Sequence, residues 1–143
     1  MLIMHILRDK GEKVHTVPAD ATLEEAAREL HARKVGAVVV LDAEGALAGV
    51  LSERDIVREV ALGGPRALAG AVSRTMTRAV FTATPDESLE EGLARMTDRR
   101  VRHLPVVNKG RLVGIVSIGD LVKRRIEDAE AQAKALTDYI SAS

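Results

Sequence analysis

A duplicated stretch limits the possible folds of this chain more than any other feature. Residues 47–57 (LAGVLSERDIV) and 112–122 (LVGIVSIGDLV) each run from a turn through a short apolar strand to a serine, and an aspartate three residues later opens a helical pattern. Aligning residues 14–58 with 80–123, with one gap at Glu44, gives 15 identities in 44 pairs. Two related units predict packing about a pseudo-twofold axis, which places two equivalent clefts between them.

The hydrophobic periodicity of each copy predicts the order β-α-β-β-α. A short helix is expected at 2–9, strands at 14–17, 36–41 and 47–51, and helices from Leu23, with Thr22 as its cap, and over 55–62. The second copy repeats this with strands at 80–83, 102–107 and 112–116 and helices from Leu89 and from Asp120 towards Ile140. We expect an α+β fold of the α/β type, divided into residues 1–65 (N-terminal helix plus first unit), 66–79 (linker), 80–125 (second unit) and 126–143 (C-terminal helical extension).

Composition excludes several classes of function. Lys plus Arg equals Asp plus Glu at 21 each, and Phe81 and Tyr139 are the only aromatic residues, so the chain lacks the basic and aromatic surface of a nucleic-acid binder. There is no cysteine, which rules out disulfides, thiolate metal sites and a cysteine nucleophile. The histidines at 5, 15 and 31 are isolated and do not have the spacing of metal ligands, so no metal is expected. No apolar run approaches the ~20 residues of a membrane helix, and a cytoplasmic protein is expected.

The combined motif resembles the cystathionine β-synthase (CBS) domain. Each unit has a strand threonine (Thr16, Thr82), then an Asp-x-(Thr/Ser)-Leu-Glu-Glu helix start, then the Gly-…-Ser-x-x-Asp stretch already described. Two such units in tandem resemble a Bateman module. The resemblance covers nearly all of residues 1–125. It implies two units packed through their sheets, a homodimer, and an adenosine-containing ligand in the clefts: AMP, ADP, ATP, NAD or S-adenosylmethionine.

The resemblance implies a favoured site in the second unit. Asp120 is the candidate for the ribose hydroxyls, although an aspartate here also suits a helix cap. Arg102 and His103 are the candidates for the ligand's phosphates, against the alternative of a solvated basic turn. Ser117 suits either phosphate binding or capping, and Met76 suits either adenine packing or the core. The full expected set is Met76, Thr82, Arg102, His103, Pro105, Ser117, Ile118, Gly119 and Asp120.

The equivalent site in the first unit is expected to be weaker. Gly36 and Ala37 stand where the second unit has Arg102 and His103, so the basic pair is missing. Arg54, or arginines of the linker, could replace it. The expected set here is Thr16, Gly36, Ala37, Ser52, Glu53, Arg54 and Asp55, with Asp55 on the ribose.

These features favour a regulatory module that senses adenosine nucleotides and acts in trans on another protein. The alternatives are a dimerisation scaffold without a ligand and, less favoured, an accessory subunit of a nucleotide-metabolising enzyme. Catalysis by the chain itself is not expected, because it has no clustered acid–base set. A helical dimer interface is expected from Leu121, Val122 and Ile126 beside Ile56, Val57 and Val60.

Overall fold

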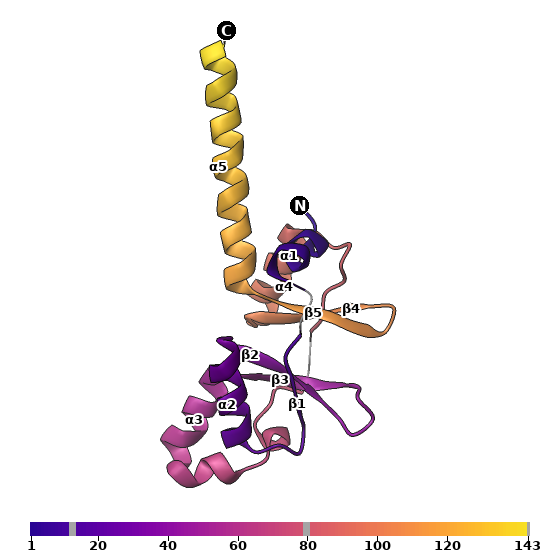
Figure 1. The fold of residues 1–143 in the computed structure, drawn as a ribbon, viewed down its shortest axis with the longest axis vertical. Coiled ribbons are helices and arrows are strands. Elements are labelled where there is room, and N and C mark those ends of the chain that lie inside the picture. Colours follow the sequence, from indigo (N-terminus) through magenta and orange to yellow (C-terminus); the bar gives the residue numbers. More distant parts are fainter. Residues whose placement is uncertain (12–13, 79–80, 143) are drawn as a thin grey trace.

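The chain folds into two lobes whose small sheets face each other, with helices on the outer side of each sheet (Figure 1). The structure is a computed structural model and describes residues 1–11, 14–78 and 81–142. The elements are α1 (Ile3–Lys10), β1 (Thr16–Pro18), α2 (Leu23–Arg33), β2 (Ala37–Leu41), β3 (Leu47–Ser52), α3 (Glu53–Gly63), the 3₁₀ turns η1 (Pro65–Ala69) and η2 (Val72–Arg74), α4 (Leu89–Arg99), β4 (His103–Asn108), β5 (Arg111–Ser117) and α5 (Ile118–Ala142). Mixed helices and sheets in two similar units confirm the predicted fold class.

The first lobe contains a three-stranded sheet in the order β1-β2-β3. β1 pairs with β2 in parallel and β2 pairs with β3 antiparallel, so that Val39 lies opposite both Thr16 and Val50. Val38, Val39 and Val40 of β2 are fully buried, and Val38 and Val40 point to the face that packs against α2 and α3. The side chain of Thr22 accepts a hydrogen bond from the backbone N–H of Glu25 (3.1 Å), which confirms the predicted cap of α2.

The second lobe repeats this plan with a smaller sheet. β4 and β5 form an antiparallel pair, and the only described trace of the strand predicted at 80–83 is a single parallel bridge from Ala83 to Val106; residue 80 lies outside the described residues. Proline chemistry explains the difference. In the first lobe Val39 donates its N–H to His15, but the equivalent residue of β4 is Pro105, which has no N–H to donate.

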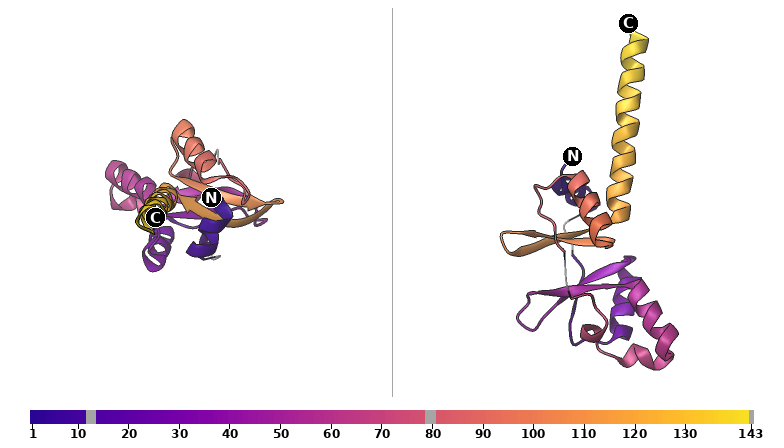
Figure 2. Two further views of the ribbon diagram at one scale, coloured as in Figure 1. Left: turned by 90° about the horizontal axis from the view of Figure 1, so that it is seen from above. Right: turned by 180° about the vertical axis from the view of Figure 1, so that it is seen from behind.

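Helix α1 packs on the second lobe although it precedes the first in the sequence. Ile3, Ile6 and Leu7 are buried in one cluster with Leu104 and Leu121. Figure 2 shows α1 at the end of the molecule from which α5 projects. The sequence-based grouping of α1 with the first unit in residues 1–65 therefore differs from its packing, because adjacency in the chain does not determine which apolar face a helix covers.

Helix α5 leaves the molecular body soon after it begins. Leu121 is fully buried, but every residue from 129 to 142 is exposed, and the helix projects well beyond both lobes (Figure 2). Among the described residues, no helix is both long and apolar enough to span a membrane.

Candidate ligand-binding site

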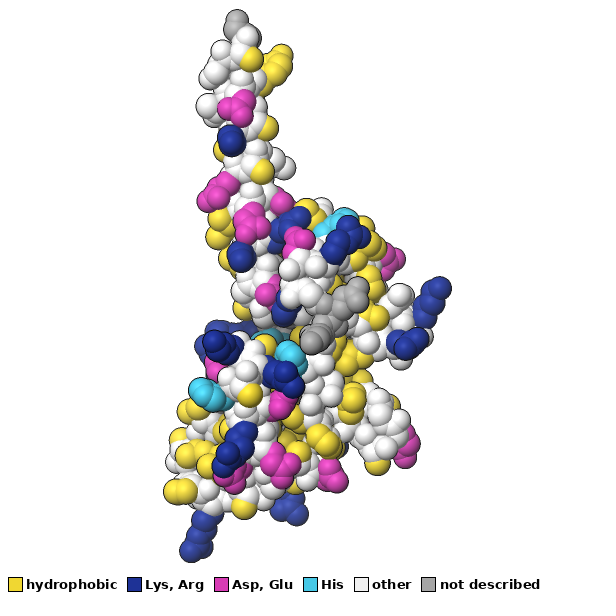
Figure 3. Space-filling model, in the orientation of Figure 1, with side chains coloured by type: hydrophobic (Ala, Val, Ile, Leu, Met, Phe, Trp, Pro, Cys, Tyr) yellow, Lys and Arg dark blue, Asp and Glu magenta, His cyan; other side chains and the backbone are white. Residues whose placement is uncertain are grey.

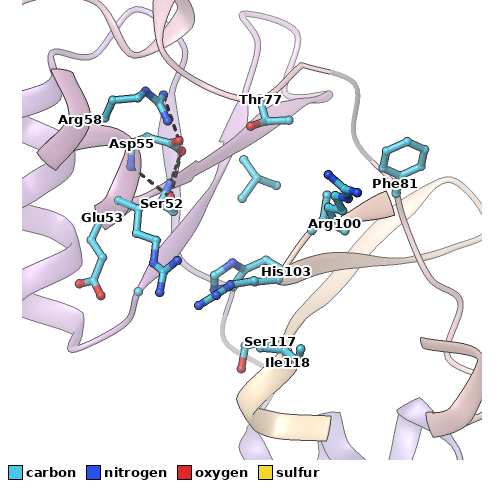
Figure 4. A pocket seen from close by; sticks show the side chains of 15 residues that line it. Ser52, Glu53, Asp55, Arg58, Thr77, Phe81, Arg100, His103, Ser117 and Ile118 are labelled. Carbon is cyan, nitrogen blue, oxygen red and sulfur yellow. Dashed lines mark hydrogen bonds and ion pairs between the residues drawn. The ribbon is translucent and has the colours of Figure 1, made fainter. Parts of the chain in front are cut away.

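A pocket of about 500 Å³ lies between the two lobes and takes residues from both. Volumes of this size are typical of small-molecule sites. Its first-lobe lining is Gly36, Val50, Ser52, Glu53, Arg54, Asp55, Arg58 and Thr77, and its second-lobe lining is Phe81, Arg100, Val101, Arg102, His103, Ser117 and Ile118. Figure 4 shows Ser52, Asp55 and Arg58 on one side and His103, Ser117 and Arg100 on the other.

The first wall is the junction where β3 ends and α3 begins. Ser52 and Asp55 cap the helix reciprocally: the Asp55 carboxylate accepts hydrogen bonds from the Ser52 N–H (2.9 Å) and hydroxyl (3.0 Å), and the Ser52 oxygen accepts from the Asp55 N–H (3.3 Å). The other Asp55 oxygen lies 3.2 Å from the Arg58 guanidinium. Ser52 and Asp55 thus cap α3, and these bonds fix both side chains at the pocket wall.

The second wall is the start of β4. Arg102 accepts a backbone hydrogen bond from Ile118 (2.8 Å), which ties the beginning of β4 to the beginning of α5. Burial lowers the pKa of His103, and the nearby positive charge of Lys10 lowers it further. The imidazole is therefore neutral at pH 7, able to donate one hydrogen bond and accept another.

The equivalent aspartate of the second lobe, Asp120, has a different environment. Lys10, the last residue of α1, donates to the Asp120 carboxylate (2.7 Å) and to the backbone oxygen of Ile115 (3.0 Å). The same carboxylate oxygen accepts the backbone N–H of Ser117 (2.8 Å), as in a helix cap. Burial alone would raise the pKa of Asp120, but the bonds from Lys10 and Ser117 outweigh it and hold the pKa below its usual value. Asp120 does not line the pocket.

The structure therefore recombines the two predicted sites. Nine of the predicted residues meet in one pocket: Gly36, Ser52, Glu53, Arg54 and Asp55 from the first set and Arg102, His103, Ser117 and Ile118 from the second. Seven do not line it: Thr16, Ala37, Met76, Thr82, Pro105, Gly119 and Asp120. Met76 belongs to the first-lobe core, which supports the core interpretation over adenine packing. The predicted basic pair thus faces the serine and aspartate of the other unit.

Several lining residues were not predicted from the sequence. Arg58 has a recognisable signal, since it lies one helical turn after Asp55 and so shares its face. Thr77 lies on the pocket because its backbone pairs with Val50 in both directions (3.0 and 3.2 Å). Phe81 lines the pocket while Arg99 stacks on its ring, 4.9 Å from the centroid. No local pattern distinguishes Thr77 or Phe81, because tertiary contacts, such as the pairing of Thr77 with Val50, bring them to the pocket.

The charge of the pocket favours an anion. Four arginines line it, at positions 54, 58, 100 and 102, against the two acidic side chains Glu53 and Asp55. With His103 neutral, the net charge of the lining is +2. Val50, Val101 and Ile118 supply apolar surface between these groups. Among the described residues, no cluster of His, Cys, Asp and Glu could hold a metal ion.

Comparison with known proteins identifies the family. The family model described as "CBS domain" matches residues 7–62 and 69–127. This chain belongs to the CBS domain family. The CBS domain-containing protein YhcV of Bacillus subtilis is 35% identical over 126 residues, 88% of each chain. CBSX3, a mitochondrial CBS domain-containing protein of Arabidopsis thaliana, is 30% identical and is matched over 71% of its length. Neither name states a catalytic activity.

Solved structures of CBS proteins share the fold. The CBS-domain protein ATU1752 of Agrobacterium tumefaciens has 44% identity and a TM-score of 0.82, covering 87% of this chain and 92% of that one. The CBS domain protein PAE2072 of Pyrobaculum aerophilum, solved with AMP, has 30% identity and a TM-score of 0.75, covering 84% and 89%. The CBS domain pair of MJ0100, solved with 5′-methylthioadenosine and S-adenosylmethionine, has 26% identity and a TM-score of 0.79, covering 90% and 98%.

Proposed function

We propose that this protein is a regulatory module that binds an adenosine-containing ligand in the pocket between its two CBS units. The observation that carries the proposal is the arrangement of that pocket, where the capped helix start at Ser52 and Asp55 faces His103 of the other unit (Figure 4), with Arg102 in the same lining. Related CBS pairs bind AMP in one case and 5′-methylthioadenosine and S-adenosylmethionine in another, which supports the ligand class.

The lining suggests how such a ligand would lie. The Asp55 carboxylate accepts the ribose hydroxyls, because a charged acceptor forms the stronger hydrogen bonds. Arg102 and Arg100 bind the phosphate, and His103 donates to it. The base lies against the apolar surface of Val50 and Val101. AMP, ADP, ATP and NAD all provide a ribose and a phosphate, and the net positive lining favours them over uncharged nucleosides.

Regulation follows from the position of the pocket. A ligand that contacts both lobes stabilises one relative arrangement of the two units, and only such differential binding can shift an equilibrium between arrangements. The protein then acts on a partner protein that distinguishes those arrangements, rather than catalysing a reaction. We place it in the cytoplasm, acting as a homodimer. A dimerisation scaffold without a ligand is the second candidate, because exposed apolar side chains on α3 and α5 suit an interface.

Calorimetric titration of nucleotide-stripped protein with AMP, ATP, NAD and adenosine tests the proposal. We expect micromolar binding of at least one nucleotide, about −8 kcal/mol. Arg102→Ala should raise the Kd for AMP by about tenfold or more, since a charged hydrogen bond contributes roughly 1.5–3 kcal/mol, and should change the Kd for adenosine little. Arg111→Ala, on β5 but away from the pocket lining, is the matched control. If no adenosine compound binds at millimolar concentration, the scaffold interpretation replaces this one.

A further inference from the structure

The projecting part of α5 carries a regular apolar stripe. Between 122 and 140 the spacing alternates between four and three residues, which is the heptad pattern of a coiled coil. The stripe consists of Val122, Ile126, Ala129, Ala133, Leu136 and Ile140. Ile126 is 53% exposed and Leu136 is 61% exposed, although both are large aliphatic side chains. Figure 3 shows hydrophobic side chains spaced along this helix, beyond the molecular body.

The body contacts a different side of the helix. Leu121 is buried, Arg124 pairs with Asp9 of α1, and Arg125 pairs with Glu90 of α4. At about 100° per residue, the stripe is centred roughly 100° around the helix axis from Leu121. A partner helix could therefore lie along the stripe without displacing any of these contacts. The segment 127–142, exposed except for the half-buried Asp128, extends about 24 Å at 1.5 Å per residue.

We propose that two copies of this chain associate through α5 as a parallel, in-register, two-stranded coiled coil. In that arrangement each stripe residue packs against the same residue of the other copy. Alanine therefore meets alanine, and each larger aliphatic side chain meets one of its own size. The proposal does not depend on the nucleotide site. The dimer interface expected from the sequence is only partly retained. Leu121 and Ile56 belonged to that interface, but both are buried within their own lobes and cannot contact a partner.

Charge complementarity determines the direction of pairing. Arg125 lies beside one edge of the stripe and Glu130 lies beside the other. In the parallel arrangement, Arg125 of each copy lies opposite Glu130 of the other copy, so this ion pair occurs twice. The guanidinium has five N–H donors and can keep its bond to Glu90 as well. An antiparallel arrangement that pairs Ile126 with Leu136 would instead set Glu130 against the partner's Glu130, which is repulsive because the two charges are alike.

The negative charge on the polar face of residues 127–142 argues against a membrane surface as the binding partner of α5. Residues 127–142 contain four acidic side chains (Glu127, Asp128, Glu130, Asp138) and one lysine (Lys134). Helices that lie on anionic membranes carry lysine and arginine on their polar face. A second copy of α5 fits both the heptad pattern and the charges.

Analytical ultracentrifugation of the full chain, without nucleotide, tests the interface. We expect a dimer of the 15.4 kDa chain. Leu136→Asp should raise the dimer Kd at least about 100-fold, because two buried leucines are lost per dimer. Ala135→Asp, the neighbouring residue on the outer face, is the matched control and should leave the dimer intact. A monomeric wild type, or equal behaviour of the two variants, would overturn the proposal.

Two further variants test the direction. The chain has no cysteine, so Leu136→Cys introduces a single thiol. Parallel pairing brings the two copies of residue 136 together and predicts a cross-linked dimer on oxidation. Antiparallel pairing separates them by about 15 Å, too far for a disulfide, which needs Cα atoms within roughly 7 Å. Glu130→Gln should weaken a parallel dimer and tighten an antiparallel one. Absence of the cross-link, or a tighter Glu130→Gln dimer, would refute the parallel arrangement.

Discussion

The two equivalent aspartates should respond differently to the same substitution. Asp55 lines the pocket, whereas Asp120 lies outside it and is bound by Lys10. Asp→Asn preserves the volume and removes the charge. We therefore expect Asp55→Asn to weaken ligand binding and Asp120→Asn to leave it nearly unchanged.

The magnitudes follow from the contacts. Loss of charge at Asp55 removes a charge-assisted hydrogen bond to the ribose, about 1.5–3 kcal/mol, which raises the Kd for AMP roughly 10- to 150-fold. At Asp120 the substitution removes the ion pair with Lys10, in which the Asp120 side chain is 26% exposed and the Lys10 side chain is 35% exposed. Solvent screening limits such a pair to about 1 kcal/mol or less of the free energy of unfolding. Asparagine can still accept the Ser117 N–H, so the cap of α5 is retained.

Titration calorimetry with AMP and urea denaturation, applied to both variants, separate these effects. The expected pattern is a binding defect in Asp55→Asn and, at most, a small stability defect in Asp120→Asn. The reverse pattern, in which Asp120→Asn loses binding and Asp55→Asn binds like wild type, would refute the reasoning. It would mean that the ligand displaces Lys10 and occupies the site that the sequence favours.

Two further predictions concern stability. Gly49→Ala should lower the free energy of unfolding by about 1–3 kcal/mol, because a Cβ there would lie 2.6 Å from the backbone oxygen of Thr77. Gly114→Ala should lower it less, since its Cβ would meet the movable end of the Leu7 side chain. An equal or larger loss of stability at Gly114 in urea denaturation would contradict this. The pKa of His103 is lowered by burial, so between that pKa and about 6.5 the unfolded chain binds more protons, and stability should fall as the pH drops below 6.5. Thermal unfolding of His103→Asn should show a shallower loss over this range, and identical pH profiles would contradict the assignment.

Much of the fold could be predicted from local patterns. The helix starting at Leu23, capped by Thr22, and the buried strand over Ala37–Leu41 are confirmed because capping chemistry and a β-branched run act over a few neighbouring residues. The strand predicted at 80–83 is reduced to one bridge at Ala83. The residue responsible, Pro105, lies more than twenty positions later in the chain, so the local pattern could not reveal it.

The sequence identified several residues that line the pocket, but not which of them lie together. Ser52, Asp55, Arg102 and His103 were all identified from the repeat and the family resemblance, and all four line the pocket. The division into two separate sites was not reproduced by the pocket. The sequence pattern predicted one complete binding site for each unit. In the structure, the basic pair of the second unit and the capped aspartate of the first unit line the same pocket.

The sequence by itself determined the duplication and most of the order of elements in each unit, and it showed the resemblance to the CBS family. These depend on spacing along the chain. The tertiary structure decided that α1 covers the second lobe and that Lys10 therefore neutralises Asp120. It also decided which walls share the pocket. These features depend on contacts between residues up to 115 positions apart, because packing of apolar faces, and not proximity in sequence, determines which charged groups meet.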